Sequence, residues 1–162
     1  MKIADFLPKG SVVITELKGV TKQEVIQELA DALLQRFPRL ERTSLIRVVE
    51  EREELGSTSI GAGIAIPHGK LNGLCQMALC VGRSAQGVDF ESFDGGLVYY
   101  VFLLLAPDIR GTLHLRMLAA MARLLKNDAL ENRLPLIKTE RDVLDLLGTE
   151  VLRDQPPLGI RP

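Results

Sequence analysis

The most constraining feature of this sequence is an uninterrupted run of ten apolar residues, LVYYVFLLLA, at 97–106. A bilayer-spanning helix needs about 20 such residues, so this run is too short to cross a membrane. It ends at Pro107 and shows no alternation of polar and apolar positions. That pattern is typical of a central strand covered on both faces. The chain is therefore expected to build a sheet with helices on each side.

The rest of the chain predicts further elements of both kinds. Strands are expected at 11–17, 63–66 and 77–83, in addition to 97–106. Helices are expected at 21–37, 44–54, 112–125, 129–134 and 140–147. Thr21 followed by Glu24 is the signature of a capping box at the start of the first helix. The order β-α-α-β-β-β-α-α-α indicates an α/β fold, with a sheet between two helical layers.

Composition and charge exclude several classes of protein. Twenty basic against 21 acidic residues give a net charge of -1, which argues against broad binding to nucleic acid or to anionic lipid. Two cysteines do not make a secreted disulfide framework, and the N-terminus lacks an apolar signal core. We expect a cytoplasmic protein that does not insert into a membrane. One domain is expected over 1–150, followed by a Pro-rich, disordered tail at 151–162.

His68 is the first candidate for chemistry, in a chain that has only two histidines. It follows the predicted strand 63–66 and lies between Pro67 and Gly69, in a segment with five glycines at 56–73. The carboxyl end of a strand is where α/β sheets commonly contact ligands. The alternative is a loop histidine without a function, which the surrounding glycines and the preceding apolar strand disfavour.

Other candidates lie on the two neighbouring predicted helices. His114 falls in the first turn of the helix capped by Thr112, where free backbone N–H groups favour an anion. Arg52 comes near the end of the second helix, just before the glycine-rich segment. Packing beside leucines would also explain His114, and a solvated surface charge would explain Arg52. Ser57 and Thr58 could bind phosphate oxygens or simply form turns.

Together these groups suit phosphoryl transfer. A neutral imidazole is a good nucleophile near pH 7. A phosphoryl group in transit needs positioned donors and a cation more than it needs a base. The sequence has no P-loop for ATP and no carboxylate cluster that suggests magnesium, so the donor must already be activated, as another phosphohistidine is. A metal hydrolase is disfavoured, because two histidines without an acidic third ligand fall short of a catalytic zinc site.

Three separated blocks of sequence resemble one known family. The string LGSTSIGAGIAIPHGKL at 55–71 closely resembles the phosphorylation-site motif of type-2 EIIA domains of the bacterial phosphoenolpyruvate-dependent phosphotransferase system, the mannitol/fructose class. VYYVFLLLAPD at 98–108 and HLRMLAAMARLL at 114–125 resemble that family's later strand and the helix that carries its second histidine. The likeness covers about residues 1–150.

The resemblance implies a fold and a site. The fold is a single three-layer α/β/α domain around a mixed sheet. His68 is then the phosphorylated residue, on Nε2, and Arg52 and His114 assist the transfer, without a metal or a cofactor. Ser57, Thr58 and Gly69 are the candidate contacts to the phosphate.

Within this family the sequence is most similar to the stand-alone nitrogen-regulatory branch. That branch takes phosphate from an HPr-like carrier and mainly regulates other proteins. Ser59 and Leu113 depart from it, since Gly usually stands at the first position and a polar residue at the second. One alternative is an EIIA component that passes phosphate to an EIIB/EIIC sugar transporter. Another is a binding module with this fold that transfers no phosphate.

Overall fold

The computed structural model describes residues 2–7, 11–108, 112–130 and 132–148. Its strands are β1 (Ser11–Ile14), β2 (Ser59–Gly61), β3 (Ile64–Ala65), β4 (His68–Leu71), β5 (Ala78–Val88) and β6 (Val98–Pro107). Its α-helices are α1 (Lys22–Arg36), α2 (Arg42–Glu54), α3 (Leu113–Leu125) and α4 (Glu140–Leu147). Short 3-10 helices lie at Ile3–Phe6, Asp128–Leu130 and Leu134–Leu136. No α-helix in these ranges is long and apolar enough to cross a membrane.

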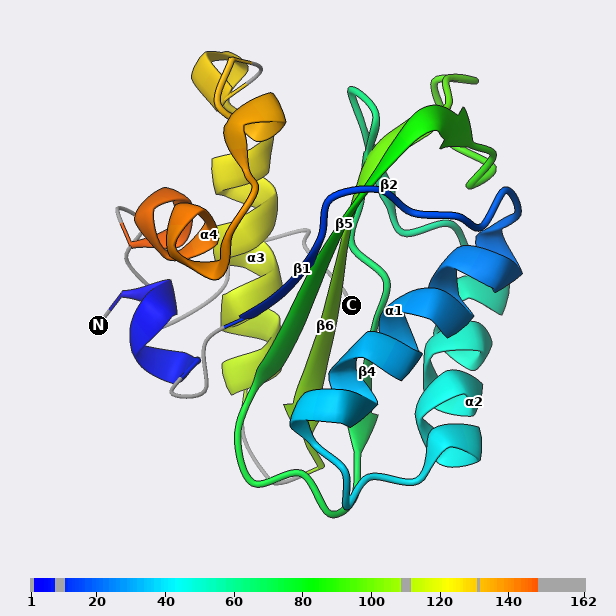
Figure 1. Cartoon of the computed structure of the whole chain (residues 1–162), viewed down its shortest axis with the longest axis vertical. Coiled ribbons are helices and arrows are strands. Elements are labelled where there is room, and N and C mark those ends of the chain that lie inside the picture. Colours follow the sequence, from blue (N-terminus) through cyan, green and yellow to red (C-terminus); the bar gives the residue numbers. More distant parts are fainter. Residues whose placement is uncertain (1, 8–10, 109–111, 131, 149–162) are drawn as a thin grey trace.

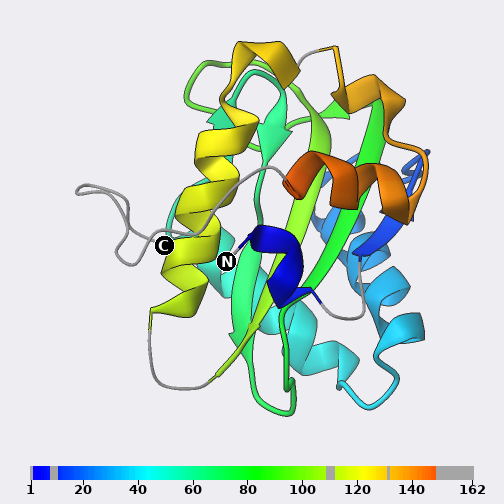
Figure 2. The same ribbon diagram turned by 90° about the vertical axis from the view of Figure 1, so that its left-hand side faces the viewer.

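The predicted three-layer arrangement is confirmed. Strand β6 pairs antiparallel with β5 on one side, and on the other it pairs parallel with both β3 and β4. Strand β1 joins β5 in parallel and β2 joins β3 antiparallel, so the sheet is mixed. Helices α1 and α2 cover one face, and α3 and α4 cover the other (Figures 1 and 2).

The apolar run that forms β6 packs against both helical layers. Phe102 and Leu104 belong to the core beneath α3 and α4, whereas Leu103 and Leu105 belong to the core beneath α1 and α2. All four side chains are buried. Because successive side chains of a strand point to opposite faces, a strand between two apolar cores must be apolar at every position. This explains the missing alternation in the sequence.

Of the two predicted helix caps, the side-chain cap of Thr21 is confirmed, although the carboxylate of Glu24 accepts from the N–H of Val20 and so does not complete a capping box. Thr112 precedes α3 but makes no side-chain hydrogen bond to it, so the predicted side-chain cap there is wrong. Thr21 precedes α1, and its hydroxyl accepts a hydrogen bond of 3.1 Å from the backbone N–H of Glu24. The prediction of one helix at 129–134 is wrong, because 3-10 helices lie at Asp128–Leu130 and Leu134–Leu136. Pro135 lies within the second one, and the α conformation is disfavoured for a residue before proline.

His68 follows the predicted strand 63–66, as expected, but it does not lie in a loop, because it is the first residue of β4, a strand that the sequence did not predict. Pro67 separates β3 from β4 and has no N–H for the ladder. Its carbonyl accepts a hydrogen bond of 3.0 Å from the N–H of Leu104, and the chain therefore stays beside β6. His68 is then paired with Leu104. The tail at 151–162 lies outside the described residues.

Candidate functional site

A cavity of about 340 Å³ lies beside β4, between the C-terminal half of α2 and the N-terminal half of α3. Its lining brings together Arg52 from α2, His68 and Gly69 from β4, and His114 from α3. Residues far apart in the sequence therefore meet at one place. Lys70 also lines the cavity and was not among the residues expected at a site.

The pairing of β4 with β6 explains which side chains reach the cavity. His68 is in register with Leu104, which packs beneath α3, so alternation along the strand turns His68 and Lys70 toward α3. Gly69 turns toward α2 instead. A Cβ atom at Gly69 would lie 2.8 Å from Cγ2 of Val48, so α2 can pack this closely on β4 only because the side chain is missing.

The hydrogen bond of His68 fixes which ring nitrogen can react. Its Nδ1 lies 2.8 Å from the carbonyl oxygen of Ile66. A carbonyl oxygen only accepts hydrogen bonds, so Nδ1 carries the proton and donates it. In the neutral ring Nε2 then holds the free lone pair. Nε2 is shielded from solvent and has no hydrogen-bond partner among the described residues. The arrangement presents one unpaired, nucleophilic nitrogen.

The surroundings favour the neutral form of both histidines. Burial lowers the pKa of His68 below its ordinary value of 6.5, and the nearby charges of Arg52 and His114 act in the same direction. The hydrogen bond to Ile66 and the charge of Glu53 oppose this shift in pKa. Burial, followed by the charge of Lys70, also lowers the pKa of His114. Both imidazoles are therefore predominantly neutral at pH 7.

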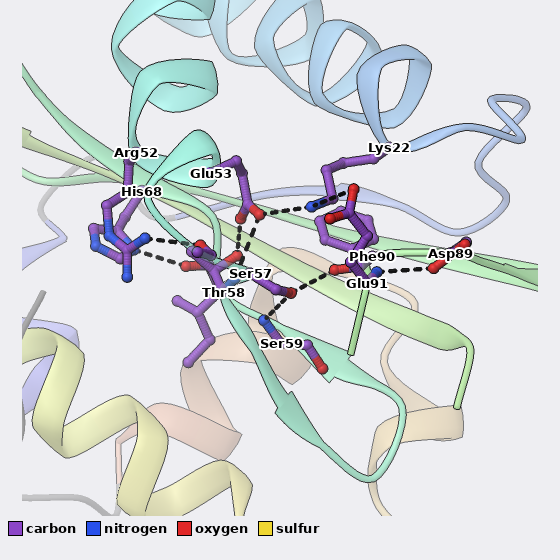
Figure 3. A network of polar contacts seen from close by, with 12 residues as sticks. Lys22, Arg52, Glu53, Ser57, Thr58, Ser59, His68, Asp89, Phe90 and Glu91 are labelled. Atoms are coloured by element: carbon purple, nitrogen blue, oxygen red, sulfur yellow. Dashed lines mark hydrogen bonds and ion pairs between the residues drawn. The ribbon is translucent and has the colours of Figure 1, made fainter. Parts of the chain in front are cut away.

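Arg52 supplies a fixed cation beside His68 (Figure 3). Its Nη1 donates a hydrogen bond of 2.9 Å to the carbonyl oxygen of Gly56. Its Nε is buried and has no partner in the described part of the chain. A guanidinium held in this way keeps donors for an anionic group. Among the described residues, no three His, Cys, Asp or Glu side chains are grouped so as to hold a metal ion.

Two of the expected phosphate contacts are placed away from the cavity lining. The hydroxyl of Ser57 donates to the carbonyl oxygen of Phe90, and the hydroxyl of Thr58 donates to the carboxylate of Glu53 (Figure 3). Neither residue lines the cavity, whereas Gly69 does. Lys70 lies two residues after His68 in the same strand, so alternation would have identified it had β4 been predicted.

Comparison with known proteins decides the family. Residues 5–149 match the family described as phosphoenolpyruvate-dependent sugar phosphotransferase system, EIIA 2. This chain belongs to the type-2 EIIA family. As a member, it is a component of a phosphotransferase system.

Two curated relatives and one solved structure show the range of this EIIA family. A nitrogen regulatory protein of Bradyrhizobium diazoefficiens is 37% identical over 148 residues, which cover 91% of this chain and 95% of the relative. The fructose-specific EIIABC component of Bacillus subtilis is 31% identical over 91% of this chain but only 23% of its own length. The crystal structure of the nitrogen regulatory protein IIA-Ntr from Neisseria meningitidis matches with a TM-score of 0.78 and 29% identity, over 90% of this chain and 98% of that one.

Proposed function

We propose that this EIIA domain is a phosphohistidine carrier with a regulatory output. It accepts a phosphoryl group from an HPr-like phosphoprotein on Nε2 of His68, and its phosphorylation state controls its binding to partner proteins in the cytoplasm. The observation that carries this proposal is the hydrogen bond from Nδ1 to Ile66, which leaves Nε2 as the reactive nitrogen. The similarity to nitrogen regulatory proteins over nearly their whole length supports the regulatory role.

The transfer is a balanced exchange between two imidazoles. The Nε2 lone pair of His68 attacks phosphorus, and an N–P bond forms while the N–P bond of the donor phosphohistidine breaks. The electron pair of the broken bond stays on the donor nitrogen. Negative charge is spread over the three phosphoryl oxygens in transit, where Arg52 and His114 can donate hydrogen bonds. The proton stays on Nδ1 throughout, in the hydrogen bond to the carbonyl oxygen of Ile66.

Phosphorylation gives the site a new charge. A phosphoryl group adds about -1.5 to -2 charges at pH 7 and three strong hydrogen-bond acceptors. The cavity that receives it lies open between two helical layers, where a partner protein can contact it. A change of this size at an interface is enough to switch binding between partners.

The direct test is labelling of the purified protein with phosphoenolpyruvate, enzyme I and an HPr-like carrier. We expect one acid-labile phosphate per chain, and His68→Ala should abolish it while the circular dichroism spectrum stays unchanged. Labelling that persists in His68→Ala would refute the assignment of the phosphorylated residue.

His114→Ala tests the supporting role of the second histidine. Loss of one positioned donor lowers a rate by about 100-fold, so this variant should label slowly but completely. The measurement is the time course of phosphate incorporation at a fixed concentration of carrier. If a folded His114→Ala protein never labelled, His114 would have to be more than a helper.

A second candidate output is sugar uptake, and the similarity to a fructose-specific EIIABC component favours it. In that case the phosphoryl group would pass to an EIIB domain. Transfer from the labelled protein to a purified fructose-class EIIB separates the two outputs, because a purely regulatory protein would keep its phosphate. A protein that is never labelled by the carrier would instead be a binding module without transfer.

A further inference from the structure

A buried carboxylate lies directly behind the site. Glu53, the residue after Arg52 in the last turn of α2, is only 8% exposed. Its carboxylate accepts a hydrogen bond from the hydroxyl of Thr58, and one oxygen lies 3.4 Å from the backbone nitrogen of Thr58. Figure 3 shows these contacts between α2 and the segment that follows it. We call this pair of residues the Glu53–Thr58 clamp.

A single backbone hydrogen bond connects Thr58 of the clamp to Ile66, the residue whose carbonyl orients His68. The carbonyl oxygen of Thr58 accepts a bond of 3.0 Å from the N–H of Ile66. The carbonyl oxygen of Ile66 in turn accepts the Nδ1 proton of His68 at 2.8 Å. The position of Thr58 therefore sets the position of the acceptor that selects the tautomer of His68.

The same clamp also supports Arg52. The N–H of Gly56 donates a bond of 3.1 Å to the carbonyl oxygen of Glu53, and the carbonyl oxygen of Gly56 accepts Nη1 of Arg52 at 2.9 Å. The turn between α2 and β2 is thus tied at Gly56 to the guanidinium and at Thr58 to the Glu53 carboxylate. The clamp is therefore connected by hydrogen bonds to both side chains that are expected to contact the phosphoryl group, to His68 through Ile66 and to Arg52 through Gly56.

Lys22 makes the buried carboxylate possible. Its Nζ lies 3.0 Å from Oε2 of Glu53, and the lysine side chain is only 11% exposed. Nζ also lies 5.3 Å above the centre of the Phe90 ring. A buried ion pair contributes little more to stability than an apolar pair of similar volume. The location of this ion pair next to the segment that positions His68 and Arg52 is better explained by a role in holding those two side chains in place.

We propose that Glu53 and Thr58, with Lys22 as counter-ion, are positioning residues that hold His68 and Arg52 in register for phosphoryl transfer. The inference rests on the proposed function, since it concerns the same site. Phosphoryl transfer depends on alignment of the attacking and leaving atoms, and a misplacement of 1 Å far from the chemistry can lower a rate by about 100-fold. The clamp acts through Ile66 and Gly56 and does not itself touch the phosphate.

The test removes one hydroxyl from the clamp. Thr58→Val keeps the shape of the side chain and deletes its bond to Glu53. We expect kcat for phosphorylation by the HPr-like carrier to fall by about 10- to 100-fold, with KM for the carrier unchanged. Thr58→Ser, which restores the hydroxyl, should recover most of the rate. Thr43→Val, at an exposed threonine on α2, the helix that carries Glu53, is the control and should label like the wild type.

A spectroscopic measurement tests the geometry without any transfer. Nitrogen-15 chemical shifts distinguish a protonated from an unprotonated ring nitrogen, so they report the tautomer of His68. We expect the wild type and Thr43→Val to show protonated Nδ1. Thr58→Val should show a mixture of the two tautomers. A variant that is destabilised but still folded has no reason to change this ratio.

The outcomes separate this inference from the proposed function. If the wild type is labelled and Thr58→Val has the same kcat and the same tautomer, the positioning role is overturned while the carrier function stands. If the wild type is not labelled at all, the carrier function fails, and the tautomer ratio still decides whether the clamp orients His68. An increase in KM alone would also overturn the inference, because it would place Thr58 at the carrier interface.

Discussion

In the proposed transfer His68 reacts only as a neutral imidazole, so its pKa sets the pH range of phosphorylation. Burial and the charge of Arg52 lower this pKa below 6.5. The neutral form therefore predominates at pH 6.5 and above, and it is lost as the pH falls through the lowered pKa. We expect the initial rate of labelling to fall as the pH is lowered, with the midpoint of this fall below pH 6.5.

Arg52→Gln tests the charge contribution. Removing the cation should move the midpoint of the His68 titration upward, toward 6.5, as measured by proton–nitrogen NMR. Arg39→Gln replaces an exposed arginine in the turn between α1 and α2 and serves as the control, with no expected shift. A midpoint above 6.5 in the wild type would show that burial does not dominate the pKa of His68.

The residues of the candidate site were easier to predict than the residues that support them. His68, Arg52 and His114 belong to residue types with recognisable chemistry, and the motif around His68 resembles a known family. Glu53 and Lys22 gave no such signal, because a charged residue on a helix is usually solvated. Only the packing of α1 against α2 brings Lys22 Nζ to 3.0 Å from Glu53 and makes the pair buried.

Among the elements, β4 shows where local patterns fail. The sequence Pro67-His68-Gly69 favours a turn, and four residues are too few to establish a strand pattern of their own. Pairing with β6 over four consecutive positions overrides that local preference. Strand β6 could be predicted because its own sequence is sufficient. Ten consecutive apolar residues indicate a strand covered on both faces, without any knowledge of the strands that pair with it.

The contact between α2 and β4 makes a prediction about packing. Gly69→Ala places a Cβ 2.8 Å from Val48 Cγ2, so α2 must shift or Val48 must change rotamer. We expect a loss of about 1–3 kcal/mol in the free energy of unfolding, measured by urea denaturation. Labelling should also slow, because α2 carries Arg52.

The double variant Gly69→Ala/Val48→Ala distinguishes a clash from other effects of the alanine. It removes Cγ2 but leaves Val48 Cβ, which lies at 3.3 Å, so stability and labelling should recover only in part. Equal stability of Gly69→Ala and the wild type would mean that the helix and the strand do not pack as closely as the structure indicates.

At the scale of the whole molecule, the cavity between the two helical layers gives an approach to His68. Under the proposed function, a phosphate donor and a phosphorylation-dependent target would both contact this cavity, and hence they should compete. Leu55, at the end of α2, lines this cavity and is 84% exposed. An exposed large apolar side chain beside a reactive group is typical of a protein-binding surface.

Leu55→Asp therefore should weaken binding of the HPr-like carrier without changing the chemistry. Loss of one apolar interface contact of about 1.4 kcal/mol corresponds to a tenfold change in affinity, so we expect KM for the carrier to rise about tenfold and kcat to stay the same.

Leu136→Asp is the matched control, because Leu136 is 67% exposed but lies in the 3-10 helix at Leu134–Leu136, outside the cavity lining. Steady-state labelling at varied carrier concentration measures both constants. If Leu55→Asp lowered kcat and left KM unchanged, Leu55 would act on the geometry of Arg52 rather than on docking, and the carrier would have to approach His68 over another part of the rim.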